Sequence, residues 1–414
     1  MVQITKFMKK FLFFTLTLLS FNAICQTITI EKTDYPYFDI FEWKGMGGIL
    51  MSKDPSGNNK QINLTLVGSQ PKSIWDQKFT PRNKEYYFIS SENARYVYFL
   101  HNLTPEEGKI YFAQLNSAGN VKATSVSLAT ALKKIGDFSL DELELRNVVV
   151  TDKALVHQFR YHDKKEKSFR EIAVFTTHHN LLVYAVELGS VTEEALKNGK
   201  ANHWRYVGFE GDKICFAVSE YQNKSNGWTV KLFNSKGELQ EGTYLNAPTS
   251  KFSSVQNIGF GTTGAYHLNT DSDAQNALLT FHNNRYYLTG IVTDKGETEL
   301  QLLEWKEKEW VKINQSTIDK TISKKGYQLG VYPLNEGLGY HLISATGDIT
   351  TVLKFDNSAT IINPFTPKTV YNPSRIIIDE NKKLFAVTLP EGNLFFNLEE
   401  LNKEGSVEFE FMAK

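Results

Sequence analysis

The stretch RYVYFL at residues 95–100, followed by the turn LNSAG at 115–119, is the part of the sequence that decides the fold. The same arrangement returns as KICFAV at 213–218 and FNSKG at 233–237. In each window 24 positions separate the basic residue from the turn glycine, and the two windows are offset by 118 positions. Because 118 is twice 59, a third copy is expected between them, and KALVHQF at 153–159 occupies that place.

The repeat continues in both directions with small slips. The middle copy places its turn at TTHHN, 176–180, where we expect Asn180 to take the left-handed conformation that glycine takes elsewhere. A later copy has a glycine-free turn near 306–309. The turns from Gly57 to Gly405 cover 348 residues in six steps, so the average unit has 58 residues and seven units fill the chain.

Each unit has the pattern of short strands joined by hairpin turns, as in KIYFAQL at 109–115 before its turn. A unit of this length accommodates four strands. The pattern resembles the secreted bacterial β-propellers, which implies an all-β fold, here with seven blades of about four strands. The resemblance is architectural: the chain lacks the Trp-Asp, kelch and Asp-box signatures, so no functional residue can be carried over. The alternative is a two-domain sandwich with fortuitously regular hairpins.

Two short helices and one insertion interrupt the strands. The first helix is expected over 127–135 with Gly136 as its stop, and SVTE at 190–193 predicts a capping box that opens a helix ending near Gly199. The stretch 246–276 is rich in Ser, Thr, Asn and Gly, and we interpret it as an inserted loop. No interdomain linker is evident, so residues 26–414 are expected to form one propeller domain.

The first 25 residues have the layout of a secretory signal peptide. A basic start is followed by an apolar core at 11–19, and small residues precede a cleavage point between Cys25 and Gln26. Lipidation of Cys25 is the alternative, but Ile24 is bulky where a lipobox has a small residue. The prediction is therefore a periplasmic, surface or secreted bacterial protein, with no later apolar run long enough to span a membrane.

Composition excludes several classes of protein. The chain of 414 residues has 46 Lys and Arg against 46 Asp and Glu. Segment 1–25 contains three lysines and no acid, so the remainder has 43 basic and 46 acidic residues and a net charge of −3. This balance argues against nucleic-acid binding, which needs a basic surplus. The low charge and the 41% hydrophobic content also exclude a disordered chain.

Removal of the signal peptide leaves Cys215 as the single cysteine. Its apolar surroundings, KICFAV, predict a buried and unreactive thiol. A large exported protein without disulfides favours a bacterial envelope over a eukaryotic secretory route.

Two motifs in the insertion suggest ligands. Asn269, Asp271 and Asp273 alternate as the ligands of a calcium loop do, but Ala274 stands where such a loop has glycine. They are therefore weak metal candidates, with a polar loop as the preferred interpretation. GFGTTG at 259–264 matches a dinucleotide fingerprint, but a strand-like run follows it instead of a helix, so we expect no cofactor there.

The remaining candidates favour structural roles. His178 and His179 fall where the repeat predicts a turn, so a solvated tip is expected. Acid pairs such as 106–107 could serve a glycosidase, but adjacency in sequence does not place two carboxyl groups across a pocket. We assign the tryptophans of strand-like runs to the core first, with one or two available for a glycan or peptide groove: Trp43, Trp204, Trp228, Trp305 and Trp310.

Three functional hypotheses remain, since propellers serve as enzymes and as binding modules alike. The first is a non-catalytic interaction module that docks a protein partner, for example in an outer-membrane transport or secretion complex. The alternative is a propeller that binds or cleaves glycans at its central face. A third is a small-ligand sensor that uses the loop 246–276. No catalytic residue is assigned.

Overall fold

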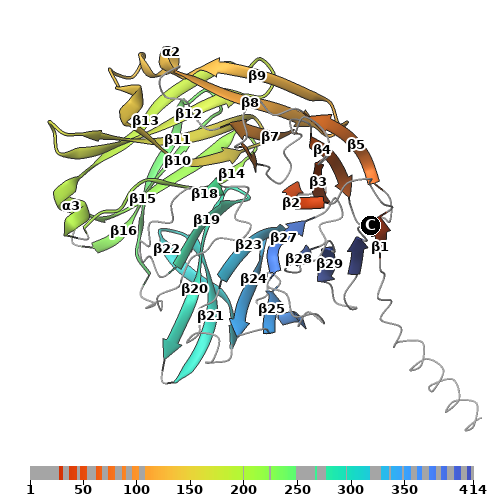
Figure 1. Ribbon diagram of the computed structural model, residues 1–414. Helices are drawn as coiled ribbons and strands as arrows, with labels where there is room; N and C mark the ends of the chain where they lie inside the picture. The colour runs from red at the N-terminus through yellow and green to blue at the C-terminus, as the bar shows by residue number, and fades with distance from the viewer. Residues whose placement is uncertain are drawn as a thin grey trace, which may run out of the picture.

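The computed structural model describes residues 108–198, 200–222, 225–248, 277–294 and 296–317 continuously, and outside these ranges it describes strands alone. Within these residues the chain is almost wholly β-structure, arranged in six curved sheets (Figure 1). The all-β prediction is confirmed. Among the described residues no helix is long and apolar enough to cross a membrane.

The sheets follow the order of the chain. The first contains β2 (Tyr37–Trp43), β3 (Gly47–Lys53), β4 (Ile62–Val67) and β5 (Ser73–Phe79). The second contains β6 (Tyr86–Ile89), β7 (Tyr96–His101), β8 (Lys109–Asn116) and β9 (Val121–Ser127). The third contains β10 (Leu143–Val150), β11 (Ala154–Asp163), β12 (Ser168–Thr177) and β13 (Val183–Thr192), with β18 (Tyr266–His267) beside β10.

An eight-stranded sheet comes next and joins two meanders. The first meander contains β14 (Arg205–Glu210), β15 (Lys213–Gln222), β16 (Ser225–Phe233) and β17 (Leu239–Asn246). The second contains β19 (Ala277–His282), β20 (Arg285–Asp294), β21 (Glu297–Lys306) and β22 (Glu309–Thr317). They meet where Gly208 pairs with Phe281. A Cβ atom at Gly208 would lie 2.1 Å from the Phe281 carbonyl oxygen, so this approach requires glycine.

The last two sheets complete the series. One contains β23 (Gln328–Leu334), β24 (Gly337–Thr346), β25 (Ile349–Phe355) and β26 (Ile361–Phe365). The other contains β27 (Pro373–Ile378), β28 (Leu384–Thr388), β29 (Phe396–Leu401) and β30 (Glu408–Phe411). Strand β1 (Ile28–Ile30) pairs in parallel with β30 and so joins the two ends of the chain in one sheet.

The first strands of the meanders lie closest to the centre around which the sheets are arranged, where they contact one another. Strand β2 contacts β27, β10 contacts β6, and β14 pairs with β19. Figure 1 shows the sheets following one another around a common centre, with the C-terminal strands back beside β1. This arrangement agrees with the propeller resemblance of the sequence.

The core lies between neighbouring sheets, because alternate residues of a strand point to opposite faces. In β11, Leu155 and Phe159 pack against Tyr98 of β7 and its neighbours. The next residue along, Val156, packs on the other face with Phe216 of β15. The third sheet, β10–β13, is therefore buried on both faces, with a different neighbour on each.

The repeated turns are confirmed at the two windows that defined the period. In the first turn, the Asn116 Oδ1 accepts hydrogen bonds from the backbone N–H groups of residues 118 and 120, and Gly119 has φ +83°. Asn234 makes the equivalent bonds to residues 236 and 238, and Gly237 has φ +74°. The same side-chain bond and the same left-handed glycine therefore close both hairpins.

The sequence also predicted two other turns; one of these predictions is confirmed and the other is wrong. The glycine-free turn is confirmed, since Glu307 and Lys308 both adopt positive φ in a two-residue hairpin. The prediction for Asn180 was wrong, because the left-handed residue of that turn is Leu181, with φ +54°. Its N–H donates to the Thr177 carbonyl, which fixes the reversal one residue later than predicted.

The helices are shorter than predicted. Helix α2 (Leu128–Leu132) is capped by Ser127, whose hydroxyl accepts from the Thr130 N–H, and the 3₁₀-helix η2 (Leu140–Glu142) follows. Helix α3 (Glu193–Lys197) is capped by Thr192, and the predicted cap at Ser190 was wrong. Ser190 belongs to β13, because the ladder with β12 continues to Thr192.

The inserted stretch 246–276 contributes a strand to a distant sheet. Strand β18 pairs antiparallel with β10, with Asn147 opposite His267 and Val148 opposite Tyr266. The strand-like run after the glycine motif is thereby confirmed over Tyr266–His267. The motif at 259–264, the metal candidates Asn269, Asp271 and Asp273, and the cleavage site Cys25–Gln26 lie outside the described residues.

Candidate functional site

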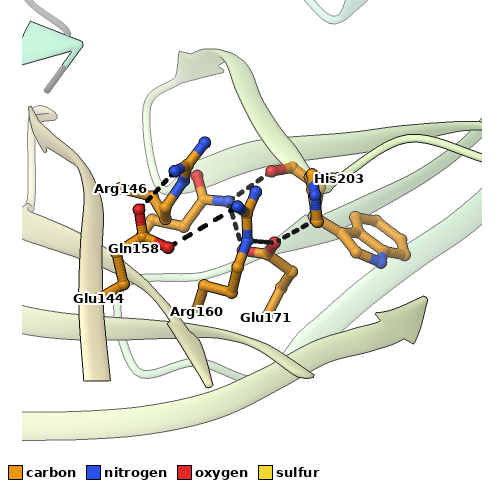
Figure 2. A network of polar contacts seen from close by, with 7 residues as sticks. Glu144, Arg146, Gln158, Arg160, Glu171 and His203 are labelled. Atoms are coloured by element: carbon orange, nitrogen blue, oxygen red, sulfur yellow. Dashed lines mark hydrogen bonds and ion pairs between the residues drawn. The ribbon is translucent and has the colours of Figure 1, made fainter. Parts of the chain in front are cut away.

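The structure places a charged network on the third sheet, and none of its members was selected from the sequence. We call it the Glu171 cluster; its members are Glu144, Arg146, Gln158, Arg160, Glu171 and His203 (Figure 2). The side chains come from β10, β11 and β12 and from the segment that leads into β14. Figure 2 shows Gln158, Arg160 and His203 around the Glu171 carboxylate, and Glu144 with Arg146 on the other side of Arg160.

Strand register brings the cluster together. Arg160 stands opposite Glu144 on one side and opposite Glu171 on the other, so the three alternate in charge across the sheet. They share the face that carries Val156 and Ala173, which is the face packed against the β14–β17 meander. The feature of the sequence that could have revealed the cluster is a charged residue on the buried face of a strand, where the other residues on that face are apolar.

Glu171 is completely buried, and each of its carboxylate oxygens has a protein partner. The Arg160 Nε donates to Oε1 at 2.9 Å, and the Gln158 Nε2 donates to Oε2 at 3.3 Å. The Nδ1 of His203 lies 3.1 Å from Oε1. A buried charge is tolerable when it is paired and hydrogen-bonded in this way, and removing one partner is costly.

The cluster also attaches the next sheet. Gln158 donates a second bond, of 2.5 Å, to the backbone oxygen of Trp204, which directly precedes β14. Lys231 of β16 donates to the Leu188 carbonyl of β13 and lies 4.8 Å from the Trp204 ring. A Cβ atom at Gly189 would lie 2.8 Å from the Trp204 Nε1, so the indole packs directly on the β13 backbone.

The solvent-facing end of the cluster is Glu144, whose side chain is 46% exposed. Arg146 donates to it at 2.7 Å, and Arg160 reaches its other oxygen at 3.7 Å. An aromatic ring adjoins this end: the guanidinium of Arg160 lies 5.6 Å from the centroid of Phe169. His162 stacks on the same ring at 4.6 Å.

The geometry of the Glu171 cluster suits a structural link between two sheets better than a catalytic site. Glu171 has no solvent-exposed surface through which it could exchange a proton with a substrate, and the exposed Glu144 is held by two arginines. Glycoside hydrolysis needs two carboxyl groups across an open pocket. Among the residues that the structure describes, no group of three or more His, Cys, Asp or Glu side chains could hold a metal ion.

A second polar group lies on the opposite face of the same sheet. We call it the Tyr98–His178 chain; it runs from Gln114 through Tyr98 and His178 to Thr151. Its hydrogen bonds are Gln114 Nε2 to Tyr98 OH at 2.8 Å, Tyr98 OH to His178 Nδ1 at 2.5 Å, and His178 Nε2 to the Thr151 oxygen at 2.7 Å. Burial lowers the pKa of His178 to about 4 and raises that of Tyr98 well above its usual value.

The prediction of a solvated histidine tip was therefore half wrong. The turn is where the repeat placed it, and His179 is exposed, but His178 is only 5% exposed. The sequence could not distinguish the two histidines because the partner of His178 comes from a strand 80 positions earlier.

The other sequence candidates fall into the core. Cys215 is fully buried, so the prediction of a buried thiol is confirmed, and burial raises its pKa, as expected for an unreactive thiol. Trp43, Trp204 and Trp228 are buried. Trp305 and Trp310 are partly exposed on β21 and β22 and pack edge to face at 5.2 Å.

Comparison with known proteins gives a fold without a family. No family model and no curated protein matches the chain. A prolyl endopeptidase structure is similar to it with a TM-score of 0.50 at 8% identity, over 91% of this chain and 48% of that one. The chain thus spans about half the length of that enzyme.

Two further similar structures are smaller. The β-propeller domain of the Trilobed protease from Pyrococcus furiosus has 9% identity and a TM-score of 0.46, over 91% of this chain and 96% of that one. TolB from Acinetobacter baumannii has 9% identity and a TM-score of 0.36, over 91% and 82%. The chain resembles β-propeller proteins, and at these identities the likeness concerns the fold alone.

Proposed function

We propose that the chain is an exported, non-catalytic β-propeller of seven four-stranded blades that docks a protein partner. Seven consecutive antiparallel meanders support the blade number, if the eight-stranded sheet is divided at its Gly208–Phe281 pairing. The pairing of β1 with β30 supports one closed domain over residues 26–414. The blades then form a rigid support for surface loops.

One observation carries the non-catalytic part of the proposal, and it is the state of the Glu171 cluster. Among the described residues this cluster has the chemical groups that a hydrolase would use. Its buried carboxylate already has Arg160, Gln158 and His203 as partners. Gln158 also bonds to the segment that leads into the next sheet, so the cluster links two adjacent sheets. A scaffold that must present a fixed surface benefits from such attachment, whereas catalysis would need one of these groups to be available.

The location and the class of partner come from the sequence. We propose that residues 1–25 are removed between Cys25 and Gln26 and that the mature protein works in the periplasm or at the cell surface. A subunit of an outer-membrane transport or secretion complex is the partner class that fits this address. Mass spectrometry of the purified protein tests the first step: an unmodified N-terminus at Gln26 supports it, and a lipid on Cys25 contradicts it.

We place the docking surface at the end of the sheets where the chain passes from one meander to the next. This end carries α2, α3 and the β11–β12 turn, whereas the opposite end has tight hairpins. Lys164 and Lys165 are exposed in the β11–β12 turn. Lys236 and Lys308 are exposed in hairpins of the opposite end, so they provide a control with the same change of charge.

Pull-down from native membranes in mild detergent tests the docking surface. We expect the wild type and the double variant Lys236→Glu, Lys308→Glu to retain the same partner, and the variant Lys164→Glu, Lys165→Glu to lose most of it. Equal recovery with both variants would contradict the surface. A protein that is monomeric and recovers no specific partner would contradict the function.

A second function, glycan binding, is favoured by the Trp305–Trp310 pair. Both rings are partly exposed, and stacking on aromatic rings is a common way to bind sugars. The pair lies on outer strands, so it supports a glycan site at the rim in place of the central face. Binding to a panel of polysaccharides that is lost in Trp310→Ala would favour this function over protein docking.

A further inference from the structure

We propose that the Tyr98–His178 chain makes the contact between the β6–β9 and β10–β13 sheets sensitive to acid. Protonation of His178 would break the chain and release the β12–β13 turn from its neighbours. This inference concerns the fold and does not depend on the proposed docking function.

The hydrogen-bond directions fix the state of the histidine. The Nε2 atom lies 2.7 Å from the Thr151 carbonyl oxygen, which can only accept, so Nε2 carries the hydrogen. The Nδ1 atom therefore has a lone pair and accepts from the Tyr98 hydroxyl at 2.5 Å. The Tyr98 oxygen accepts in turn from the Gln114 amide. The chain is complete only when His178 is neutral.

Protonation changes what each member can do. A hydrogen on Nδ1 would point at the Tyr98 oxygen, which would then accept from both His178 and Gln114. The hydroxyl hydrogen of Tyr98 would lose its acceptor, although this side chain is fully buried. A buried hydroxyl without an acceptor and a buried imidazolium are both unfavourable, so the charged state favours opening of the contact.

The surroundings of the histidine disfavour a positive charge. Desolvation is the largest cause of the lowered His178 pKa, the hydrogen bond to the Thr151 carbonyl raises the pKa by less, and the charges of His179 and Lys153 lower it further. Tyr96 lies against the ring at a centroid distance of 4.9 Å. The titratable groups that act on His178 are Tyr96 and Tyr98 of β7, Lys153 of the β10–β11 turn, and His179. Asp152 is the neighbour of Lys153 in that turn, and His157 lies further along β11.

The segment that would be released is defined by its bonds. The backbone N–H of His178 donates to the Lys153 carbonyl, so the β12–β13 and β10–β11 turns are joined at this point. The His178 carbonyl also accepts from the Gln114 amide of β8 at 3.2 Å. The bonds between Thr177 and residues 181 and 182 are internal to the turn. Opening would therefore separate the two turns from each other and from β7 while the strands of the sheet stay paired.

Two NMR measurements on the intact wild-type protein test this. Titration of the histidine ring signals should place His178 well below pH 6, in the Nε2–H tautomer at neutral pH. Amide hydrogen exchange at His178, whose N–H bonds to the Lys153 carbonyl across the two turns, should show opening that increases roughly 20-fold from pH 7 to pH 5 after correction for intrinsic rates. Amides of Ala217 and Val218 in β15 should change much less. Titration near pH 6.5, or the Nδ1–H tautomer, would overturn the proposal.

Two matched variants separate His178 from general acid effects. His178→Gln keeps a donor near the Thr151 oxygen but cannot titrate, so the pH dependence of exchange at the amide of residue 178 should disappear. His157 is also buried, and desolvation lowers its pKa to about 3, but it stacks on Phe159 of its own strand. His157→Gln should therefore keep the pH dependence at the turn. Dependence that survives His178→Gln, or is lost only in His157→Gln, would overturn the proposal.

Discussion

The third sheet, β10–β13, contacts its two neighbours through different chemistry. Towards β6–β9 it uses the Tyr98–His178 chain, which is neutral, lies at the hairpin end and depends on hydrogen-bond direction. Towards β14–β17 it uses the Glu171 cluster, which is charged. Its central residue, Glu171, lies near the start of β12, away from the hairpin end. The comparison teaches that one sheet can hold its two neighbours by contacts that fail under different conditions.

The largest expected effect is the loss of Arg160. Arg160→Met removes the guanidinium and leaves Glu171 ionised and buried, so we expect the free energy of unfolding to fall by about 3–5 kcal/mol. Urea denaturation followed by fluorescence measures this. The double variant Arg160→Met, Glu171→Gln removes the buried charge as well, and it should recover part of the loss. A single variant within about 1 kcal/mol of the wild type would show that the cluster does not hold the sheets together.

The next effect is the response of the neutral chain to acid. His178 has a pKa of about 4 in the folded protein and about 6.5 unfolded, so the unfolded state binds more protons between these values. Stability is therefore complete above pH 6.5 and decreases as the pH falls to 4, by about 3 kcal/mol. Denaturation midpoints at pH 7, 5.5 and 4.5 in wild type and His178→Gln measure it. Parallel curves for the two proteins would contradict the assignment.

A smaller loss is expected from Tyr98→Phe. The change keeps the ring packed but removes the group between Gln114 and His178, which leaves a donor and an acceptor unpaired. We expect a cost of about 1–3 kcal/mol, measured by urea denaturation at pH 7. Tyr96→Phe is the matched control, because its ring contact with His178 is kept. Equal costs for the two variants would show that the hydroxyl of Tyr98 has no special part.

The Glu171 cluster and the Tyr98–His178 chain also show how much of the structure could be predicted from the sequence. The period of about 58 residues, the asparagine-glycine turns and the buried Cys215 were predictable, because they depend on local pattern. The exposed state predicted for His178 was wrong because its partners come from β7 and β8, far away in sequence.

The Glu171 cluster was missed for a related reason. Its ladder depends on the register between strands, and a bulge between Leu145 and Asn147 shifts the alternation of β10 just where Glu144 meets Arg160. His203 comes from a connecting segment whose path follows from no local pattern. A charged residue in an apolar strand signalled that something was paired, but not with which partner.

The smallest expected effect separates the exposed end of the Glu171 cluster from its buried end. Glu144 is 46% exposed, and glutamine keeps a side-chain oxygen that can accept from Arg146, so Glu144→Gln should cost at most about 1 kcal/mol, falling further with added salt. Arg160 keeps its bond to Glu171 in this variant, so β11 and β12 remain joined. A loss as large as that of Arg160→Met, independent of salt, would mean that Glu144 and Glu171 act as one unit. The contrast between a buried core and an exposed end would then not hold for this cluster.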